Sequence, residues 1–125
     1  PLHGGGGSIR SFIHIEDVVR GTLKIMRQAQ PGEIFHLSTR EQISIRRLVE
    51  LIADKVNCAF DNLIETVGER PGKDAAYLLD STKVEREFGW RPEVSIAEGI
   101  EQTVRWVDEN FAVLSQLPLN YEHKK

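Results

Sequence analysis

Three charged residues have the types and the spacing to bind an anion, and none of them lies in a predicted helix. Arg70 and Asp74 flank a Pro-Gly turn at 71–72, and Arg10 lies in a predicted strand. The planar guanidinium of arginine can bind a phosphate through two parallel hydrogen bonds, which a lysine ammonium cannot do. Asp74 could orient Arg70 or accept a hydrogen bond from a sugar hydroxyl. The pattern indicates anion binding, although a solvated loop with surface ion pairs explains it equally well.

The sequence shows no group of residues arranged for catalysis. A catalytic centre needs a nucleophile, or an acid and a base, held close together. His14 and His36 each lie in a predicted strand, and neither has a partner at the spacing of metal ligands. Cys58 is the single cysteine, which excludes a disulfide framework or a cysteine-based zinc site within one chain. We predict no catalytic residue, no bound cofactor and no metal site in this chain.

The overall composition is that of an ordinary globular domain. The chain has 125 residues, 40% hydrophobic and 28% charged, which fits one domain with a modest core. Its formal net charge of −3 argues against a nucleic-acid or anionic-membrane surface. No apolar run approaches the roughly 20 residues that span a bilayer, and no secretion signal is visible. We expect a cytoplasmic protein with no nucleic-acid or membrane partner.

The elements that must position the charged residues follow the order β-α-β-α-β-loop-β-α-α. The strands are expected at 9–15, 33–38, 63–67 and 76–79, as extended or alternating apolar segments. Ser44 and Ser95 are the expected N-caps of two amphipathic helices, and Glu98 completes a capping box with Ser95. A first helix is expected from Glu16 or Asp17 to about residue 28, and a short one over 81–88 that ends at Gly89.

These elements predict an α+β fold with about four helices and a few short strands. Residues 1–114 are expected to form a single domain that begins with a glycine-rich loop at 1–8, flexible by composition, and 115–125 a loose tail. The helices carry most of the apolar surface, and four short strands scarcely make a sheet that could cover them. We therefore expect exposed strand edges and apolar helix faces, which favour homo-oligomers.

Two groups of motifs together resemble one protein family. The segment Arg10-Ser11-Phe12-Ile13-His14-Ile15-Glu16-Asp17 resembles the Arg-x-Phe-[Ile/Val]-[His/Tyr]-[Val/Ile]-x-Asp segment of NAD-dependent nucleotide-sugar epimerases and dehydratases, which are extended short-chain dehydrogenases. The Arg-Pro-Gly-Lys-Asp-x-x-Tyr motif at 70–77, the helix start at 80–83 and the Phe-Gly-Trp-x-Pro motif at 88–92 resemble the C-terminal part of that family. The dTDP-glucose 4,6-dehydratase branch is the most similar. The chain departs from that branch at Ala76, usually arginine, and at His36, commonly asparagine.

The resemblance implies a substrate-binding role for four residues. Arg10 would contact the diphosphate of a nucleotide sugar, and Arg70 would reach the same diphosphate or the ribose. Asp74 would hold Arg70 or a hydroxyl, and His36 would border the nucleotide. NAD is implied for the complete enzyme, and we expect this chain to hold neither the glycine-rich NAD-binding turn of a Rossmann core nor the catalytic Tyr-x-x-x-Lys pair. The spacing itself occurs at Tyr121 and Lys125, but these residues fall in the expected loose tail.

Three functional hypotheses remain open from the sequence. The chain is the substrate-binding C-terminal part of a nucleotide-sugar 4,6-dehydratase or epimerase, and is inactive by itself. Alternatively, it is a non-enzymatic module that binds nucleotide diphosphates or associates with itself. The third hypothesis is a truncated remnant without a function.

Overall fold

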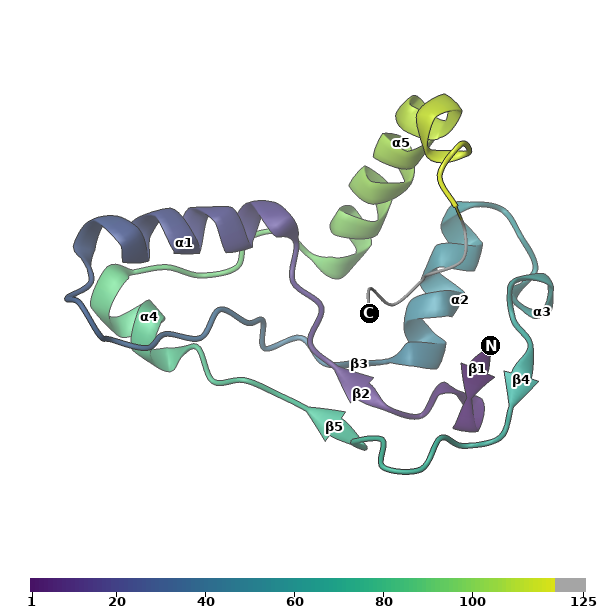
Figure 1. Ribbon diagram of the computed structural model, residues 1–125, viewed down its shortest axis with the longest axis horizontal. Helices are drawn as coiled ribbons and strands as arrows, with labels where there is room; N and C mark the ends of the chain where they lie inside the picture. The colour runs from purple at the N-terminus through teal and green to yellow at the C-terminus, as the bar shows by residue number, and fades with distance from the viewer. Residues whose placement is uncertain (119–125) are drawn as a thin grey trace.

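The computed structural model describes residues 1–118, which form an open α+β arrangement of short strands between two groups of helices (Figure 1). Helices α1 (Ile15–Gln28) and α4 (Thr82–Phe88) pack together at one end. Helices α2 (Ile45–Lys55), α3 (Phe60–Leu63) and α5 (Ile96–Leu114) lie at the other, where α2 packs on both α3 and α5. The predicted fold class is therefore correct, with the four-residue α3 as the helix that the sequence pattern missed.

The helix boundaries follow local hydrogen-bonding signals. Ser44 Oγ accepts a hydrogen bond from the backbone N–H of Arg47 at 3.1 Å, and Ser95 Oγ accepts one from Glu98 at 3.3 Å. Gly89 ends α4 in the left-handed region, at φ 59°. These features confirm the predicted N-caps at Ser44 and Ser95 and the stop at Gly89, because each serine side chain satisfies a donor in its own first turn. The second half of the capping box is not formed within residues 1–118, since the Glu98 carboxylate accepts from Gln102 instead. The N-cap of α1 is His14 instead of Glu16 or Asp17, since the Asp17 carboxylate is engaged elsewhere.

The five strands are two residues long each. They are β1 (Leu2–His3), β2 (Ile9–Arg10), β3 (Ile43–Ser44), β4 (Thr66–Val67) and β5 (Ala76–Tyr77). Strand β1 pairs with β4 in parallel, and β2 lies between β3, antiparallel, and β5, parallel. The strand predicted at 33–38 is absent, and the one predicted at 9–15 pairs only at its start. Extended backbone becomes a strand only beside a second segment, and within residues 1–118 none pairs with 33–38.

The glycine-rich loop is ordered, contrary to the expectation from its composition. Residues 4–6 form a 3-10 turn against the start of α2, where Arg46 Nε donates to the Gly5 carbonyl at 3.0 Å. Gly6 is buried with φ 74°, and a Cβ there would lie 2.8 Å from the backbone nitrogen of Arg46. Glycine is therefore required at this position for close packing, which the composition alone does not reveal.

The predicted tail falls largely outside the described residues. Helix α5 ends at Leu114, and the backbone N–H of Ser115 still bonds to Phe111 at 2.9 Å. Residues 119–125 of the expected loose tail are not among those that the structure describes.

A buried aspartate links α1 to the segment that precedes α5. Asp17 has no exposed surface, and its carboxylate accepts hydrogen bonds from the backbone N–H groups of Glu93 at 3.0 Å and Val94 at 3.1 Å. Arg20 forms an ion pair with the same carboxylate. The buried Trp90 donates from Nε1 to the Asp17 carbonyl at 3.0 Å. We call this group of five residues the Asp17 latch; it fixes α1 against the 90–94 segment.

The Asp17 latch predicts an acid-sensitive fold. Burial acts to raise the pKa of Asp17, but the hydrogen bonds from Glu93, Val94 and Arg20 outweigh it and lower the pKa below 3.8. A carboxyl with a folded pKa below its unfolded one stabilises the protein above the unfolded pKa and loses this contribution as pH falls through the folded one. Thermal unfolding should therefore show a falling midpoint below about pH 4. Asp17→Asn should flatten this dependence; an unchanged acid slope would contradict the assignment.

Candidate functional site

Arg10 and the loop at 68–74 are brought together by strand pairing. The register between β2 and β5 places Ile9 opposite Ala76 and Arg10 opposite Tyr77. The backbone N–H of Ile9 donates to the Ala75 carbonyl at 2.8 Å, and Arg10 Nη2 donates to the Asp74 carbonyl at 3.1 Å. Two of the predicted site residues, Arg10 and Asp74, are thus in direct contact, although 64 positions separate them.

The guanidinium of Arg10 retains donors for a ligand. Its Nη1 donates to the carbonyl of Ile9 at 2.7 Å, and its Nη2 to that of Asp74. A guanidinium carries five N–H donors, so these two bonds fix its orientation and leave others free. The side chain is only partly buried, at the edge of the three-stranded sheet. This is the arrangement of an arginine that is oriented before an anion arrives.

The side chain of Lys73 makes contacts within the protein instead of pointing into solvent. Its ammonium pairs with Glu69 at 2.6 Å and lies 3.5 Å from the carbonyl of His3. The hydrogen bond from Lys73, followed by one from the backbone N–H of Arg70, lowers the pKa of Glu69. His3 Nδ1 also hydrogen-bonds the carbonyl of Gly68 at 3.2 Å. Lys73 and His3 therefore bind the loop to strand β1, and the charge of the Lys73 ammonium is already neutralised by Glu69.

Arg70 differs from Lys73 because its side chain has no ion-pair or hydrogen-bond partner within residues 1–118. It is exposed and directly precedes the turn at 71–72, in which Gly72 has φ 75° as a Pro-Gly turn predicts. The carboxylate of Asp74 is likewise exposed, and no hydrogen bond joins it to Arg70 in the described part of the chain. As far as residues 1–118 show, the loop thus presents one unpaired guanidinium and one unpaired carboxylate.

His36 lies apart from the other three predicted residues. It is exposed in the segment between α1 and β3. Hydrogen bonds from Thr82 lower the pKa of Asp80, and the charges of Arg40 and His36 add to this effect. His36 is therefore near the start of α4, and within residues 1–118 no hydrogen bond links it to the other three. Its nucleotide-binding role stays a prediction.

Sequence reasoning missed the residues that anchor the loop. Ser8 Oγ donates to the carbonyl of Asp74 at 3.2 Å, from a buried position 66 residues away. His3 reaches Gly68 across 65 residues. No spacing signal could have revealed these contacts, because both depend on β1 and β2 lying beside the second half of the chain.

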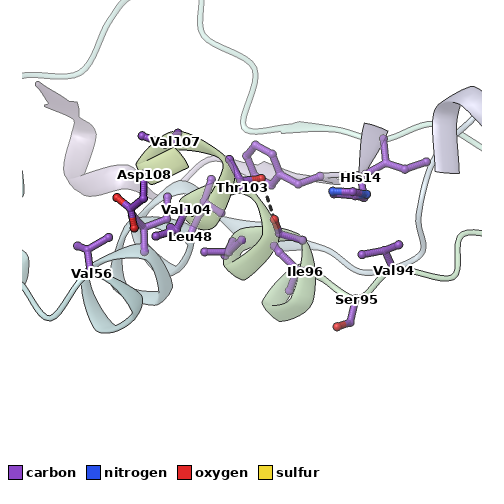
Figure 2. Close-up of a pocket in the computed structure, with 15 residues that line it drawn as sticks. His14, Leu48, Val56, Val94, Ser95, Ile96, Thr103, Val104, Val107 and Asp108 are labelled. Carbon is purple, nitrogen blue, oxygen red and sulfur yellow. Dashed lines mark hydrogen bonds between the residues drawn. The ribbon is translucent and has the colours of Figure 1, made fainter. Parts of the chain in front are cut away.

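An apolar cavity of about 450 Å³ lies elsewhere, between α2, α5 and the segment 12–14 (Figure 2). It is lined mainly by aliphatic side chains, among them Leu48, Val56, Ile96, Val104 and Val107. Thr103 is already hydrogen-bonded to the Gly99 carbonyl at 2.7 Å, and no arginine or lysine among residues 1–118 lines the cavity. A diphosphate would find no cation there, so this cavity is not the anion site.

Neither a metal-binding cluster nor a membrane-spanning helix is found within residues 1–118. Among these residues no cluster of three or more His, Cys, Asp or Glu side chains could hold a metal ion. None of their helices combines the length and the apolar character needed to cross a bilayer.

Comparison with solved structures defines the class of protein first. DesIV, a dTDP-glucose 4,6-dehydratase from Streptomyces venezuelae, was solved with NAD and TDP bound. It matches with a TM-score of 0.83 and 35% sequence identity, and the match covers 90% of this chain and 35% of the DesIV chain. The UDP-glucose 4-epimerase of Thermotoga maritima, solved with UDP-glucose, matches with a TM-score of 0.78 and 28% identity, over 87% and 35%. The chain has the fold of the C-terminal portion of these short-chain dehydrogenase enzymes.

The family model for GDP-mannose 4,6 dehydratase matches residues 1–103, and the chain belongs to this family. Among curated relatives, dTDP-glucose 4,6-dehydratases from Streptomyces antibioticus and Homo sapiens are each 34% identical, over 90% and 88% of this chain. The chain spans about a third of their length, 33% in both cases. The resemblance to the C-terminal part of a nucleotide-sugar dehydratase is therefore confirmed, as is the branch.

Proposed function

We propose that this chain is the nucleotide-sugar-binding portion of an NAD-dependent 4,6-dehydratase or epimerase, and that it positions the diphosphate of the substrate. The observation that carries the proposal is the pairing of β2 with β5, which sets the oriented guanidinium of Arg10 beside the loop that presents Arg70. Two arginines suit a diphosphate because each can form bidentate hydrogen bonds with its oxygens. The solved relatives with bound TDP and UDP-glucose support this ligand class.

Each residue of the site has a distinct proposed role. Arg10 binds the diphosphate from the sheet edge, and Arg70 binds it from the loop. The carboxylate of Asp74 accepts a hydrogen bond from a sugar or ribose hydroxyl, since within residues 1–118 no hydrogen bond or ion pair engages it with Arg70. His36 borders the nucleotide on the side of Asp80.

The residues of this chain do not fit an NAD site. A dinucleotide site needs a glycine-rich turn between a buried strand and a helix whose N-terminus receives the pyrophosphate. The glycine loop here follows β1 but leads into β2, so the strand-turn-helix order of a dinucleotide site is not found at this loop within residues 1–118. We therefore assign NAD, hydride transfer and the Tyr-x-x-x-Lys pair to the complete enzyme. This chain would contribute binding energy remote from the reacting carbon, which holds the sugar in place.

The compartment that we propose is the cytoplasm. Cys58 is the single cysteine of the chain and is partly buried, so the chain forms no internal disulfide that would require an oxidising compartment.

Titration calorimetry of the chain tests the binding role. We expect TDP and UDP to bind with an affinity that falls as salt rises, because charge pairing with two arginines is screened. Thymidine, which lacks the phosphates, should not bind measurably. Equal binding of thymidine and TDP, or no binding of either diphosphate, would contradict the proposal. An assay with NAD and dTDP-glucose should show no turnover, and turnover would overturn the inactive state that we propose for the isolated chain.

A non-enzymatic diphosphate-binding module is the second candidate function, favoured by the same two arginines. A fusion experiment separates the two functions. The chain is joined to a dTDP-glucose 4,6-dehydratase from which the C-terminal third has been removed, and turnover of dTDP-glucose is measured. Restored turnover supports the first, and binding without restoration supports the second.

A further inference from the structure

Two parallel strand pairs place the glycine-rich loop beside the loop that carries Arg70. Strand β1 pairs with β4 and β2 pairs with β5, both in parallel. The segment 4–8 joins β1 to β2, and the segment 68–75 joins β4 to β5. The two connections therefore run side by side in the same direction (Figure 1). The glycine-rich loop thus adjoins the anion site, although the proposed function gives it no role.

Ser8, at the end of the glycine-rich loop, holds the carbonyl group of Asp74. Its side chain is buried, and Oγ donates to that carbonyl oxygen at 3.2 Å, while Arg10 Nη2 donates to the same oxygen at 3.1 Å. A carbonyl oxygen has two lone pairs, so these two donors saturate it. The carbonyl of Ser8 in turn accepts from the backbone N–H of Ile45 at 3.0 Å, at the start of α2. Ser8 therefore connects the loop at 68–74 to a helix as well as to the strand of Arg10.

The other end of the loop at 68–74 rests on Gly4. A Cβ at Gly4 would overlap the Glu69 carboxylate, so the absence of a side chain lets this carboxylate lie against the glycine-rich loop. Glu69 pairs with Lys73 at 2.6 Å and accepts a hydrogen bond from the backbone N–H of Arg70 at 3.0 Å. Arg70 therefore lies between two anchored points, the Glu69 pair on one side and the Asp74 carbonyl on the other.

We propose that the glycine-rich loop positions the diphosphate site, and that Ser8 is the positioning residue through which it acts. This inference rests on the proposed function, because it concerns the arginines that would bind the diphosphate. The Ser8 hydroxyl holds the Asp74 carbonyl, and with it the short span that presents Arg70, at a fixed place relative to Arg10. A loop that is already ordered loses less conformational entropy when the ligand binds, which raises the affinity. Ser8 touches no ligand in this arrangement and acts through the placement of Arg70.

Titration calorimetry of Ser8→Ala with TDP tests this role. The substitution removes one hydroxyl, and Arg10 keeps its own bonds to the Ile9 and Asp74 carbonyls. We expect the affinity for TDP to fall about three- to tenfold, the cost of one neutral hydrogen bond. In the ligand-free variant, amide hydrogen exchange over residues 68–75 should become faster, while exchange in α5 stays the same, because only this loop loses an anchor. Unchanged exchange over 68–75 would show that Ser8 does not hold the loop.

A double-substitution cycle with Arg70→Ala distinguishes positioning from a general loss of stability. Once the Arg70 side chain is absent, Ser8 has no guanidinium to position, so adding Ser8→Ala should change the TDP affinity less than about twofold. A general loss of stability would lower the affinity by the same factor in both backgrounds, and additive losses would therefore overturn the proposal. Ser8→Thr keeps the hydroxyl and should retain the affinity of the original chain. A loss as large as that of Ser8→Ala would show that the hydroxyl is not the group that matters.

The control is Thr103→Val, which removes a hydroxyl that donates to the Gly99 carbonyl within α5 at 2.7 Å. It should bind TDP like the original chain, and its hydrogen exchange over 68–75 should be unchanged. If the original chain binds TDP and Ser8→Ala binds it equally well, this inference is overturned and the binding proposal stands. If the original chain binds no TDP, the proposed function fails and this inference fails with it.

Discussion

Asp17→Ala is expected to lower the free energy of unfolding by about 2–4 kcal/mol. The substitution removes the acceptor for the backbone N–H groups of Glu93 and Val94, and these donors are left unpaired in a part-buried site. It also removes one of the two carboxylates that pair with Arg20, which keeps its ion pair with Glu93. The loss exceeds that of an ordinary hydrogen bond, because an unpaired buried donor costs its full desolvation energy. Urea denaturation followed by tryptophan fluorescence is a suitable measurement, since the buried Trp90 belongs to the latch.

Two companion variants separate this effect from the general loss of a carboxylate. Asp54→Ala, at an exposed position of α2, should change the stability by less than about 0.5 kcal/mol. Asp17→Asn keeps one carbonyl acceptor but loses the charge, so its stability should fall between that of the original chain and that of Asp17→Ala. If Asp17→Ala and Asp54→Ala proved equally stable, the latch would have no energetic importance.

Arg70→Ala is expected to weaken TDP binding by about 10- to 100-fold, the cost of one or two charge-assisted hydrogen bonds. The unfolding midpoint should not change, because the exposed Arg70 side chain forms no hydrogen bond or ion pair in the described part of the fold. Arg70→Lys keeps the charge but not the bidentate geometry, so it should recover only part of the affinity. Titration calorimetry and thermal unfolding, performed on the same preparations, measure both effects.

Arg10 and Arg86 serve as comparisons for Arg70. Arg10→Ala should weaken binding and also loosen the loop, since it removes the hydrogen bond to the Asp74 carbonyl. Arg86→Ala removes an exposed guanidinium from α4, where its one ion pair in the described part of the chain is with the adjacent Glu87. This variant should bind TDP normally. If Arg70→Ala bound TDP normally, the loop would not belong to the binding site. The alternative interpretation, a solvated loop with surface charges, would then be correct.

The relation between sequence and fold differs between the helices and the strands. Ser44, Ser95 and Gly89 determine helix ends through hydrogen bonds or backbone angles within their own turn, and all three were predictable. The segment 33–38 has the composition of a strand but no neighbour that pairs with it within residues 1–118. Strand formation depends on a second segment, so the composition of one segment cannot decide it.

For the candidate site, the sequence by itself predicted which residues are suited to bind a diphosphate. It also determined the family, which the comparisons confirm. Only the tertiary structure decided how these residues are arranged. In the folded chain Arg10 contacts Asp74, 64 positions away, and Lys73 pairs with Glu69 inside the loop. His36 lies near Asp80. The tertiary structure also buried Asp17, whose partners lie 76 and 77 positions away. The physical reason is that residue chemistry is local, whereas contacts between distant segments exist only once the chain has folded.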